Sequence, residues 1–107
     1  MVVTPSDFQK ISLKIGKITA ATSIPGKTKI LTVTVDLGDR VAQAIVGGAE
    51  YYEPAAFIGR LVVVLTNMAP KIVAGIKSEA MLLAADVNGK PVWLTVQEDV
   101  PAGTVVR

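Results

Sequence analysis

Hydrophobic and polar residues alternate most regularly in the segment ILTVTVDLG at 30–38. Its leucines and valines fall at every second position, and threonines and an aspartate fall between them. A period of two is typical of a strand with one face on the core and the other toward solvent. The segment is therefore predicted to be a half-buried strand.

A second strand is predicted just before it, over residues 12–22, with its leucine and isoleucines inward and its lysines outward. Gly16 interrupts the alternation and predicts a bulge or a bend, which a small barrel needs where it turns a corner. The segment SIPGKTK at 23–29 contains Pro-Gly and is predicted to be the loop between these two strands.

The middle of the chain predicts two more strands and one helix. VAQAIV at 41–46 follows a short turn at 38–40 and forms a hairpin with the preceding strand. A short helix is predicted within 49–60, because Pro54 suits the first turn of a helix. LVVVLT at 61–66 is apolar throughout, which is typical of a strand buried on both faces.

The last third predicts a long loop over 67–78, followed by a hairpin. EAMLLAADV at 79–87 and PVWLTV at 91–96 flank Asn88-Gly89, a strong signal for a two-residue hairpin turn. Residues 97–107 form a tail that closes the chain.

This order of elements predicts an all-β fold. A five-stranded barrel with one short helix between strands 3 and 4 is the pattern of the OB-fold, whose members often bind oligonucleotides or oligosaccharides on one face. An SH3-like barrel or a small β-sandwich also fits the pattern. The length of 107 residues indicates a single domain over 1–107.

Composition argues against catalysis. The chain has no cysteine and no histidine, which excludes disulfides, Cys-ligated zinc and the usual general base at neutral pH. Gly47-Gly48 lacks the spacing of a phosphate-binding loop, and Glu79 has no recognisable catalytic partner. A non-catalytic protein without cofactors is expected.

Half of the residues are hydrophobic, only 19% are charged, and the mean hydropathy is +0.49. A small domain cannot bury so much apolar surface alone, so a second copy or another partner is expected to cover part of it. A stable monomer with an apolar surface is the alternative. The chain shows neither a membrane-length apolar run nor a signal-peptide pattern, so a cytoplasmic location is expected.

The net charge is only +2, but the charges are unevenly distributed. Five lysines lie between Asp7 and Asp36 with no acid among them: Lys10, Lys14, Lys17, Lys27 and Lys29. A second acid-free stretch at 54–78 contains Arg60, Lys71 and Lys77. If these cations lie on one side of the barrel, they form a positive patch that can follow a phosphate backbone. The alternative is that lysine simply occupies solvent-facing positions of strands and loops. Aromatic residues for stacking on bases are scarce, which favours recognition of the shape of a folded RNA.

Several motifs resemble one known family. They are KIGKI at 14–18, VDLG at 35–38, IVGG at 45–48, YYEPAAFIGR at 51–60 and NMAPKIVAGIKSEAMLLAA at 67–85. Over residues 7–107 the chain is similar to the tRNA-binding domain of stand-alone tRNA-binding proteins, of the C-terminal part or β-subunit of methionyl-tRNA synthetases, and of the cytokine precursors of animal synthetase complexes. The CsaA secretion chaperone is related.

The resemblance implies an OB-fold with a C-terminal extension, a homodimer, and binding of tRNA at the outside corner of its L without strong sequence preference. It also implies an accessory role beside methionyl-tRNA synthetase. The candidate nucleic-acid-binding residues, from charge and resemblance together, are Lys14, Lys17, Lys27, Lys29, Asn67, Lys71, Lys77, Ser78 and Met81. The amide of Asn67 and the hydroxyl of Ser78 are expected to bond phosphate or sugar, and Met81 belongs to the floor of a pocket or to the core.

The chain departs from the family at one loop. Ala69, Ile72 and Ala74 stand where tRNA-binding members usually carry basic residues, and each lost phosphate contact lowers affinity. The alternative hypothesis is therefore a peptide-binding export chaperone like CsaA, in which Ile72, Val73 and Ile76 form an exposed apolar lip. In a simpler interpretation, these three side chains pack against the barrel and hold the loop in place. A third possibility is a purely structural module whose role is dimerisation.

Overall fold

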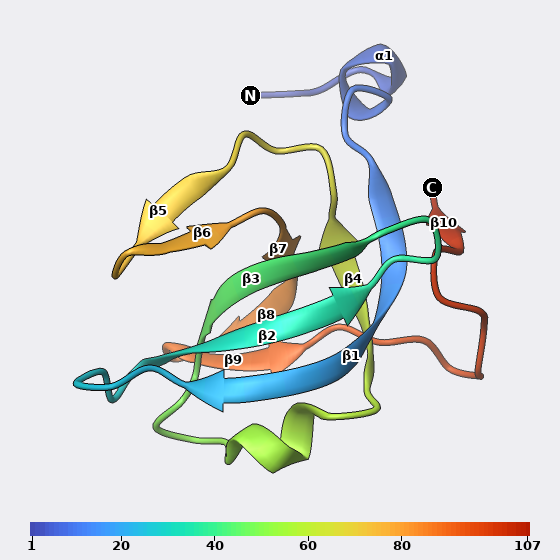
Figure 1. The fold of residues 1–107 in the computed structure, drawn as a ribbon. Coiled ribbons are helices and arrows are strands. Elements are labelled where there is room, and N and C mark those ends of the chain that lie inside the picture. Colours follow the sequence, from blue (N-terminus) through green and yellow to red (C-terminus); the bar gives the residue numbers. More distant parts are fainter.

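The computed structural model describes all 107 residues, and Figure 1 shows the order of the elements. Two short helical elements are present, α1 (Pro5–Phe8) and the 3₁₀ helix η1 (Pro54–Phe57). The strands are β1 (Leu13–Ser23), β2 (Ile30–Asp36), β3 (Val41–Gly47), β4 (Leu61–Leu65), β5 (Lys71–Val73), β6 (Ile76–Ser78), β7 (Met81–Leu82), β8 (Ala84–Val87), β9 (Lys90–Trp93) and β10 (Val105–Val106). Neither helical element has the length and apolar character needed to cross a membrane.

Five strands form the sheet at the centre of the molecule, in the order β3-β2-β1-β4-β7, and this sheet curls into a nearly closed barrel. The inward positions follow the predicted alternation, since Leu31, Val33 and Val35 of β2 are completely buried. The single predicted helix is the short η1, whose Phe57 is buried under one end of the barrel. The prediction of an all-β, OB-like barrel with one short helix between strands 3 and 4 is confirmed.

The β1 bulge lies three residues from the predicted place. The register of β1 on β2 shifts between Ile18 and Ala20, whereas Gly16 continues the pairing with β4. A Cβ atom on Gly16 would lie 2.3 Å from Cγ1 of Val35. Gly16 therefore serves close packing of the barrel wall, and the bend itself is made at Thr19.

Strand β4 differs from its prediction in burial. Val62 and Val64 are buried, but Leu61, Val63 and Leu65 are only partly covered, so β4 has one buried face and one half-buried face. The backbone of Val63 donates to the Leu94 carbonyl and accepts from the Leu83 amide, so these two residues lie beside β4.

The predicted loop at 67–78 contains a hairpin, β5–β6. Its two-residue turn places Ala74 at φ 52° and Gly75 at φ 77°, the combination of a type I′ turn. Alanine rarely adopts a positive φ, and this is why the turn gave no sequence signal. The predicted strand at 79–87 is divided into β7 and β8, and the hairpin turn at Asn88-Gly89 is confirmed.

The C-terminal tail is an ordered extension that returns to β1. Val105 and Val106 pair with Lys14 and Leu13, a strand that the sequence did not predict. Two backbones pass very close together there: a Cβ atom on Gly103 would lie 2.6 Å from the carbonyl oxygen of Leu37. Glycine is thus required for the tail to dock on the barrel.

Candidate nucleic-acid interface

A groove of about 430 Å³ crosses the outer face of β1, β2 and β3. Its floor is polar, because the outward positions of the alternating strands carry Thr32, Thr34 and Gln43. Pro25 in the β1–β2 loop forms one wall, and Ile76 at the start of β6 forms the other. None of the lining residues is charged, so the groove offers hydroxyl and amide groups for hydrogen bonds.

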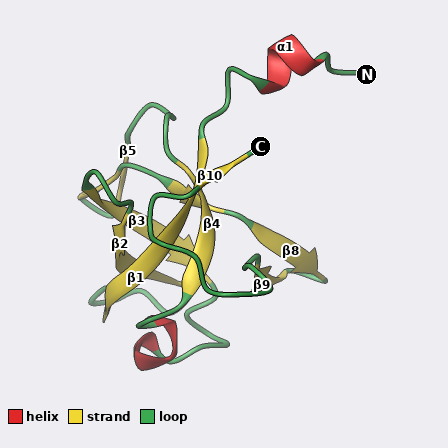
Figure 2. Ribbon diagram, turned by 90° about the vertical axis from the view of Figure 1, so that its right-hand side faces the viewer, coloured by secondary structure: helices red, strands yellow, loops and turns green.

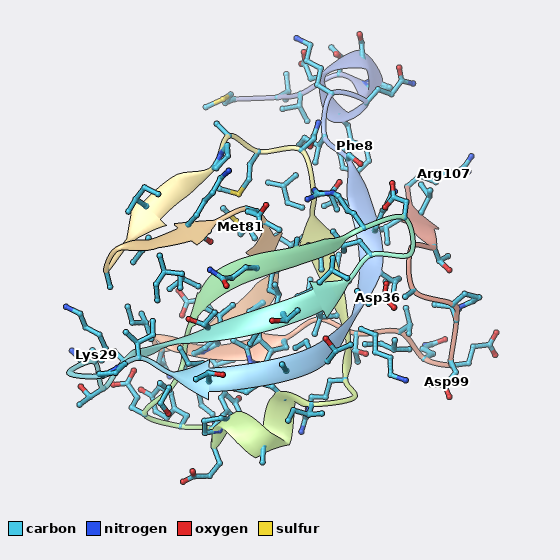
Figure 3. The ribbon with its side chains drawn as sticks, in the orientation of Figure 1. Phe8, Lys29, Asp36, Met81, Asp99 and Arg107 are labelled. Carbon is cyan, nitrogen blue, oxygen red and sulfur yellow. The ribbon has the colours of Figure 1, made fainter.

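Four lysines lie on the two elements that border this groove, the β1–β2 loop and the β5–β6 hairpin, although none of them lines it. Lys27 and Lys29 are exposed in the β1–β2 loop, and Lys71 and Lys77 are exposed on the β5–β6 hairpin. The only ion pair in the molecule joins two other residues, so all four ammonium groups are free of acidic partners. We call these four the groove lysines. Figure 3 shows Lys29 at the tip of its loop, well away from Asp36 at the other end of β2.

Lys14 and Lys17 do not belong to this group. They lie on the first half of β1, where Lys17 is opposite Asp36, and Lys14 Nζ is 3.5 Å from Asp39 Oδ2. β1 is 11 residues long, so the chain runs up to about 33 Å before it reaches the loop with Lys27. The lysines therefore form two groups at opposite ends of the β1–β2 hairpin, and not the single patch that was expected.

Ser78 and Glu79 close the barrel between the β5–β6 hairpin and β3. Ser78 Oγ accepts a hydrogen bond from the Ile45 amide at 3.1 Å, and the Ser78 side chain is buried. The Gln43 amide donates to Glu79 Oε1 at 3.1 Å, while the Glu79 amide donates to the Gln43 carbonyl at 2.8 Å. The hydroxyl of Ser78 is thus held inside the fold, away from any ligand in the groove.

Asn67 also makes contacts that hold the fold together. Its Oδ1 accepts from the Ser12 amide at 2.9 Å, and its Nδ2 donates to the Lys10 carbonyl at 2.7 Å. Thr66 adds a hydrogen bond from its hydroxyl to the Ser12 hydroxyl at 2.8 Å. These bonds fasten the N-terminal segment to the start of the 67–78 segment.

The two faces of the β5–β6 hairpin differ in exposure. The register places Ile72 opposite Lys77 on one face and Val73 opposite Ile76 on the other. Ile72 is 67% exposed, whereas Val73 and Ile76 are half-buried. Of the three residues expected to form an apolar lip, one projects into solvent and two pack toward the barrel.

Met81, labelled in Figure 3, lines a second, smaller cavity of about 240 Å³ beside the β5–β6 hairpin. Met68, Val73 and Lys71 also line it, and Met81 is 45% exposed. Methionine adapts its shape to different apolar groups, so this cavity suits an aliphatic group better than a phosphate.

The sequence did not single out the polar floor of the groove. Thr32 and Thr34 were recognised as outward-facing, but nothing local shows that Gln43 and Ile76 join them across the barrel. Lys90 is a further cation that was missed; its Nζ lies 5.7 and 5.5 Å from the ring centres of Tyr51 and Tyr52. Lys90 follows the Asn88-Gly89 turn directly, and this position in the sequence indicates an exposed cation at the tip of a hairpin.

A family model described as "Putative tRNA binding domain" matches residues 13–105, nearly the whole chain. The chain belongs to this tRNA-binding domain family. Among similar proteins, methionine–tRNA ligase of Methanothrix thermoacetophila is 41% identical over 106 residues, and that of Archaeoglobus fulgidus is 38% identical over 104. Each match covers 97–98% of this chain but only 16% of the relative, so the chain spans about one sixth of these ligases.

Solved structures agree with this assignment. A MetRS-related protein from Pyrococcus horikoshii has a TM-score of 0.94 and 28% identity, covering 100% of this chain and 99% of its own. The chaperone CsaA from Bacillus anthracis has a TM-score of 0.90 and 29% identity, with both chains fully covered. The predicted resemblance to both branches of the family is confirmed.

Proposed function

We propose that this family member is a non-catalytic tRNA-binding protein that contacts the backbone of tRNA without strong sequence preference. The observation that carries the proposal is the polar groove bordered by the two elements that carry the groove lysines, in a chain whose family is defined by a tRNA-binding domain. The ammonium groups would pair with phosphates on either side. The hydroxyls of Thr32 and Thr34 would bond phosphate oxygens or ribose 2′-hydroxyls between them.

The chemistry of the groove favours the backbone over the bases. No aromatic side chain lines it, so no base can stack there. Lysines and hydroxyls bind phosphate and sugar, which every nucleotide carries. Discrimination among RNAs then comes from the spacing of phosphates on a folded molecule.

The proposal also covers the partners of the protein and the place where it acts. Methionine–tRNA ligases of archaea and bacteria contain a segment like this chain, which supports an accessory role in presenting tRNA to methionyl-tRNA synthetase. Activity as a homodimer in the cytoplasm, without a cofactor, is part of the same proposal. The apolar composition supports the homodimer, because half of the residues are hydrophobic but only 18 of 107 are buried.

Competition binding tests the proposed ligand. Labelled bulk tRNA is titrated with the protein, and unlabelled tRNA, double-stranded RNA and single-stranded poly(U) are added as competitors. We expect tRNA of any acceptor type to compete best, because the groove lysines would match a folded phosphate surface. Equal competition by poly(U), or no binding to tRNA at low salt, would contradict the proposal.

One observation favours a second candidate function, an export chaperone for unfolded chains. Ile72 projects into solvent and the methionine-lined cavity lies behind the same hairpin, as an apolar peptide site would require. The likeness to CsaA supports this candidate. Suppression of the aggregation of an unfolded client, lost in Ile72→Ser and competed by peptide but not by tRNA, would establish it in place of RNA binding.

A further inference from the structure

The start of β4 and the segment after β9 border a pocket that the proposed function does not use. Its volume is about 260 Å³. Pockets for drug-sized ligands hold about 300–1,000 Å³, so this one suits a smaller molecule. Its lining consists of residues 59–62, Trp93 and residues 95–99, and none of these lines the groove. We call it the Arg60 pocket.

The barrel holds the walls of the Arg60 pocket in place. The Thr95 hydroxyl donates to the Leu61 carbonyl at 2.7 Å, which ties the segment after β9 to β4. Trp93 packs edge-on against Phe57, with ring centres 5.9 Å apart. The pocket is therefore formed by contacts within the chain, as is usual for small-molecule sites.

Opposite charges line the Arg60 pocket without pairing. The single ion pair of the molecule lies elsewhere, so no carboxylate oxygen is within 4.0 Å of the Arg60 guanidinium. Arg60 Nε donates to the Ala56 carbonyl at 2.7 Å, which leaves the two terminal nitrogens to face a planar anion. Glu98 and Asp99 are exposed and line the same pocket. A ligand with both an anionic and a cationic group would pair with both kinds of side chain.

The rest of the lining is largely apolar. Leu61, Val62, Trp93 and Val96 contribute hydrophobic surface. The indole N–H of Trp93 is buried and has no acceptor within the chain. Buried N–H groups nearly always have a partner, so a hydrogen bond is left unmade beside this pocket. The pocket thus combines separated charges with an apolar wall.

We propose that the Arg60 pocket binds a free α-amino acid with an apolar side chain. The carboxylate would lie on Arg60, the ammonium on Glu98 and the side chain against Trp93. Asp99 also lines a neighbouring hollow together with Lys17, so Glu98 is the main partner of the ammonium. A phosphate would meet two carboxylates beside the one cation, so the pocket favours a zwitterion over a nucleotide. This site is independent of RNA binding.

The fluorescence of Trp93 tests the site directly, because the chain has no other tryptophan. Titration with L-leucine should change the emission saturably, with a Kd of about 0.1–1 mM for a ligand of about nine non-hydrogen atoms. 4-Methylpentanoate lacks the ammonium, 3-methylbutylamine lacks the carboxylate and glycine lacks the apolar side chain. Each should bind at least about ten-fold more weakly than leucine.

Isothermal titration calorimetry with the same compounds covers binding that leaves the fluorescence unchanged. Neither heat nor an emission change with leucine would overturn the proposal. Equal affinity of 4-methylpentanoate, 3-methylbutylamine and leucine would also overturn it, because the two charges would then play no part in binding.

Two variants assign the charged groups. Arg60→Gln and Glu98→Gln should each weaken leucine binding at least about ten-fold while the β circular dichroism spectrum is retained. Lys27→Gln and Glu53→Gln are the matched controls, since each removes one exposed charge of the same sign far from the pocket lining, and both should bind leucine as the wild type does. Wild-type affinity in Arg60→Gln and Glu98→Gln, or equal loss in all four variants, would refute the site.

Discussion

Neutralising two groove lysines should weaken tRNA binding and flatten its dependence on salt. In the double variant Lys27→Gln, Lys29→Gln, the β1–β2 loop keeps its length and polarity but loses both cations. Each phosphate that a lysine neutralises contributes about 0.7–0.9 to the slope of log K against log salt. If all four groove lysines contact phosphate, the wild-type slope is about −2.8 to −3.6 and that of the variant is about −1.4 to −1.8.

These slopes give a measurable difference in affinity. Between 50 and 200 mM salt, wild-type affinity should fall about 50- to 150-fold and that of the double variant about 7- to 12-fold. Filter binding or fluorescence anisotropy with bulk tRNA at four salt concentrations would measure both slopes.

The chain offers a control with the same change of charge. Lys14→Gln with Lys17→Gln also removes two cations, but from the end of β1 where Asp36 and Asp39 lie. We expect this variant to keep the wild-type slope. Equal loss of slope in the two double variants would show that net charge alone drives binding, and an unchanged slope in Lys27→Gln, Lys29→Gln would refute the groove as the interface.

Three further predictions concern the fold around the groove. Ser78→Ala leaves the Ile45 amide without its acceptor at the barrel closure, so the free energy of unfolding in urea should fall by about 1–3 kcal/mol. Asn67→Ala removes both bonds to the N-terminal segment, so hydrogen exchange at the Ser12 amide should speed up while global stability falls by no more than about 1 kcal/mol, because the site is exposed. Gly103→Ala sets a Cβ atom against the Leu37 carbonyl at a φ of 92°, so it should cost at least about 1–2 kcal/mol and expose β10 to proteolysis; an unchanged melting temperature would contradict this packing argument.

The sequence predicted those parts of the fold that depend on local chemistry. Alternation in residues 30–38 and the Asn88-Gly89 turn each carry their signal within a few residues, and both are confirmed. The β5–β6 hairpin was missed because its turn uses Ala74 in a left-handed conformation that alanine seldom adopts. The pairing of β10 was missed because it depends on a close approach of Gly103 to Leu37, 66 positions apart in the chain and visible only in three dimensions.

The candidate site was harder to predict because it depends on distance in space. Lysines 14 and 17 are close in sequence to lysines 27 and 29, but a long strand separates the two pairs. Conversely, Lys77 is far in sequence from Lys27, and barrel closure through Ser78 and Glu79 brings its hairpin to the groove. Residues expected to bind ligand, such as Ser78 and Asn67, are the ones that build this arrangement.

The groove and the exposed apolar side of the β8–β9 hairpin lie on different parts of the barrel, so RNA binding and the proposed self-association do not compete for one surface. The groove lies on the outer face of β1, β2 and β3 beside the β5–β6 hairpin, and Figure 2 places that hairpin on the side opposite β8–β9. A second copy packed against the exposed Val87, Val92 and Leu94 of the β8–β9 hairpin would therefore leave the groove lysines of both protomers exposed to solvent. Binding of RNA and self-association should then be independent, so the double variant Val92→Glu, Leu94→Glu should keep the salt slope per protomer even as a monomer. Loss of that slope would mean that the RNA interface is built from both copies.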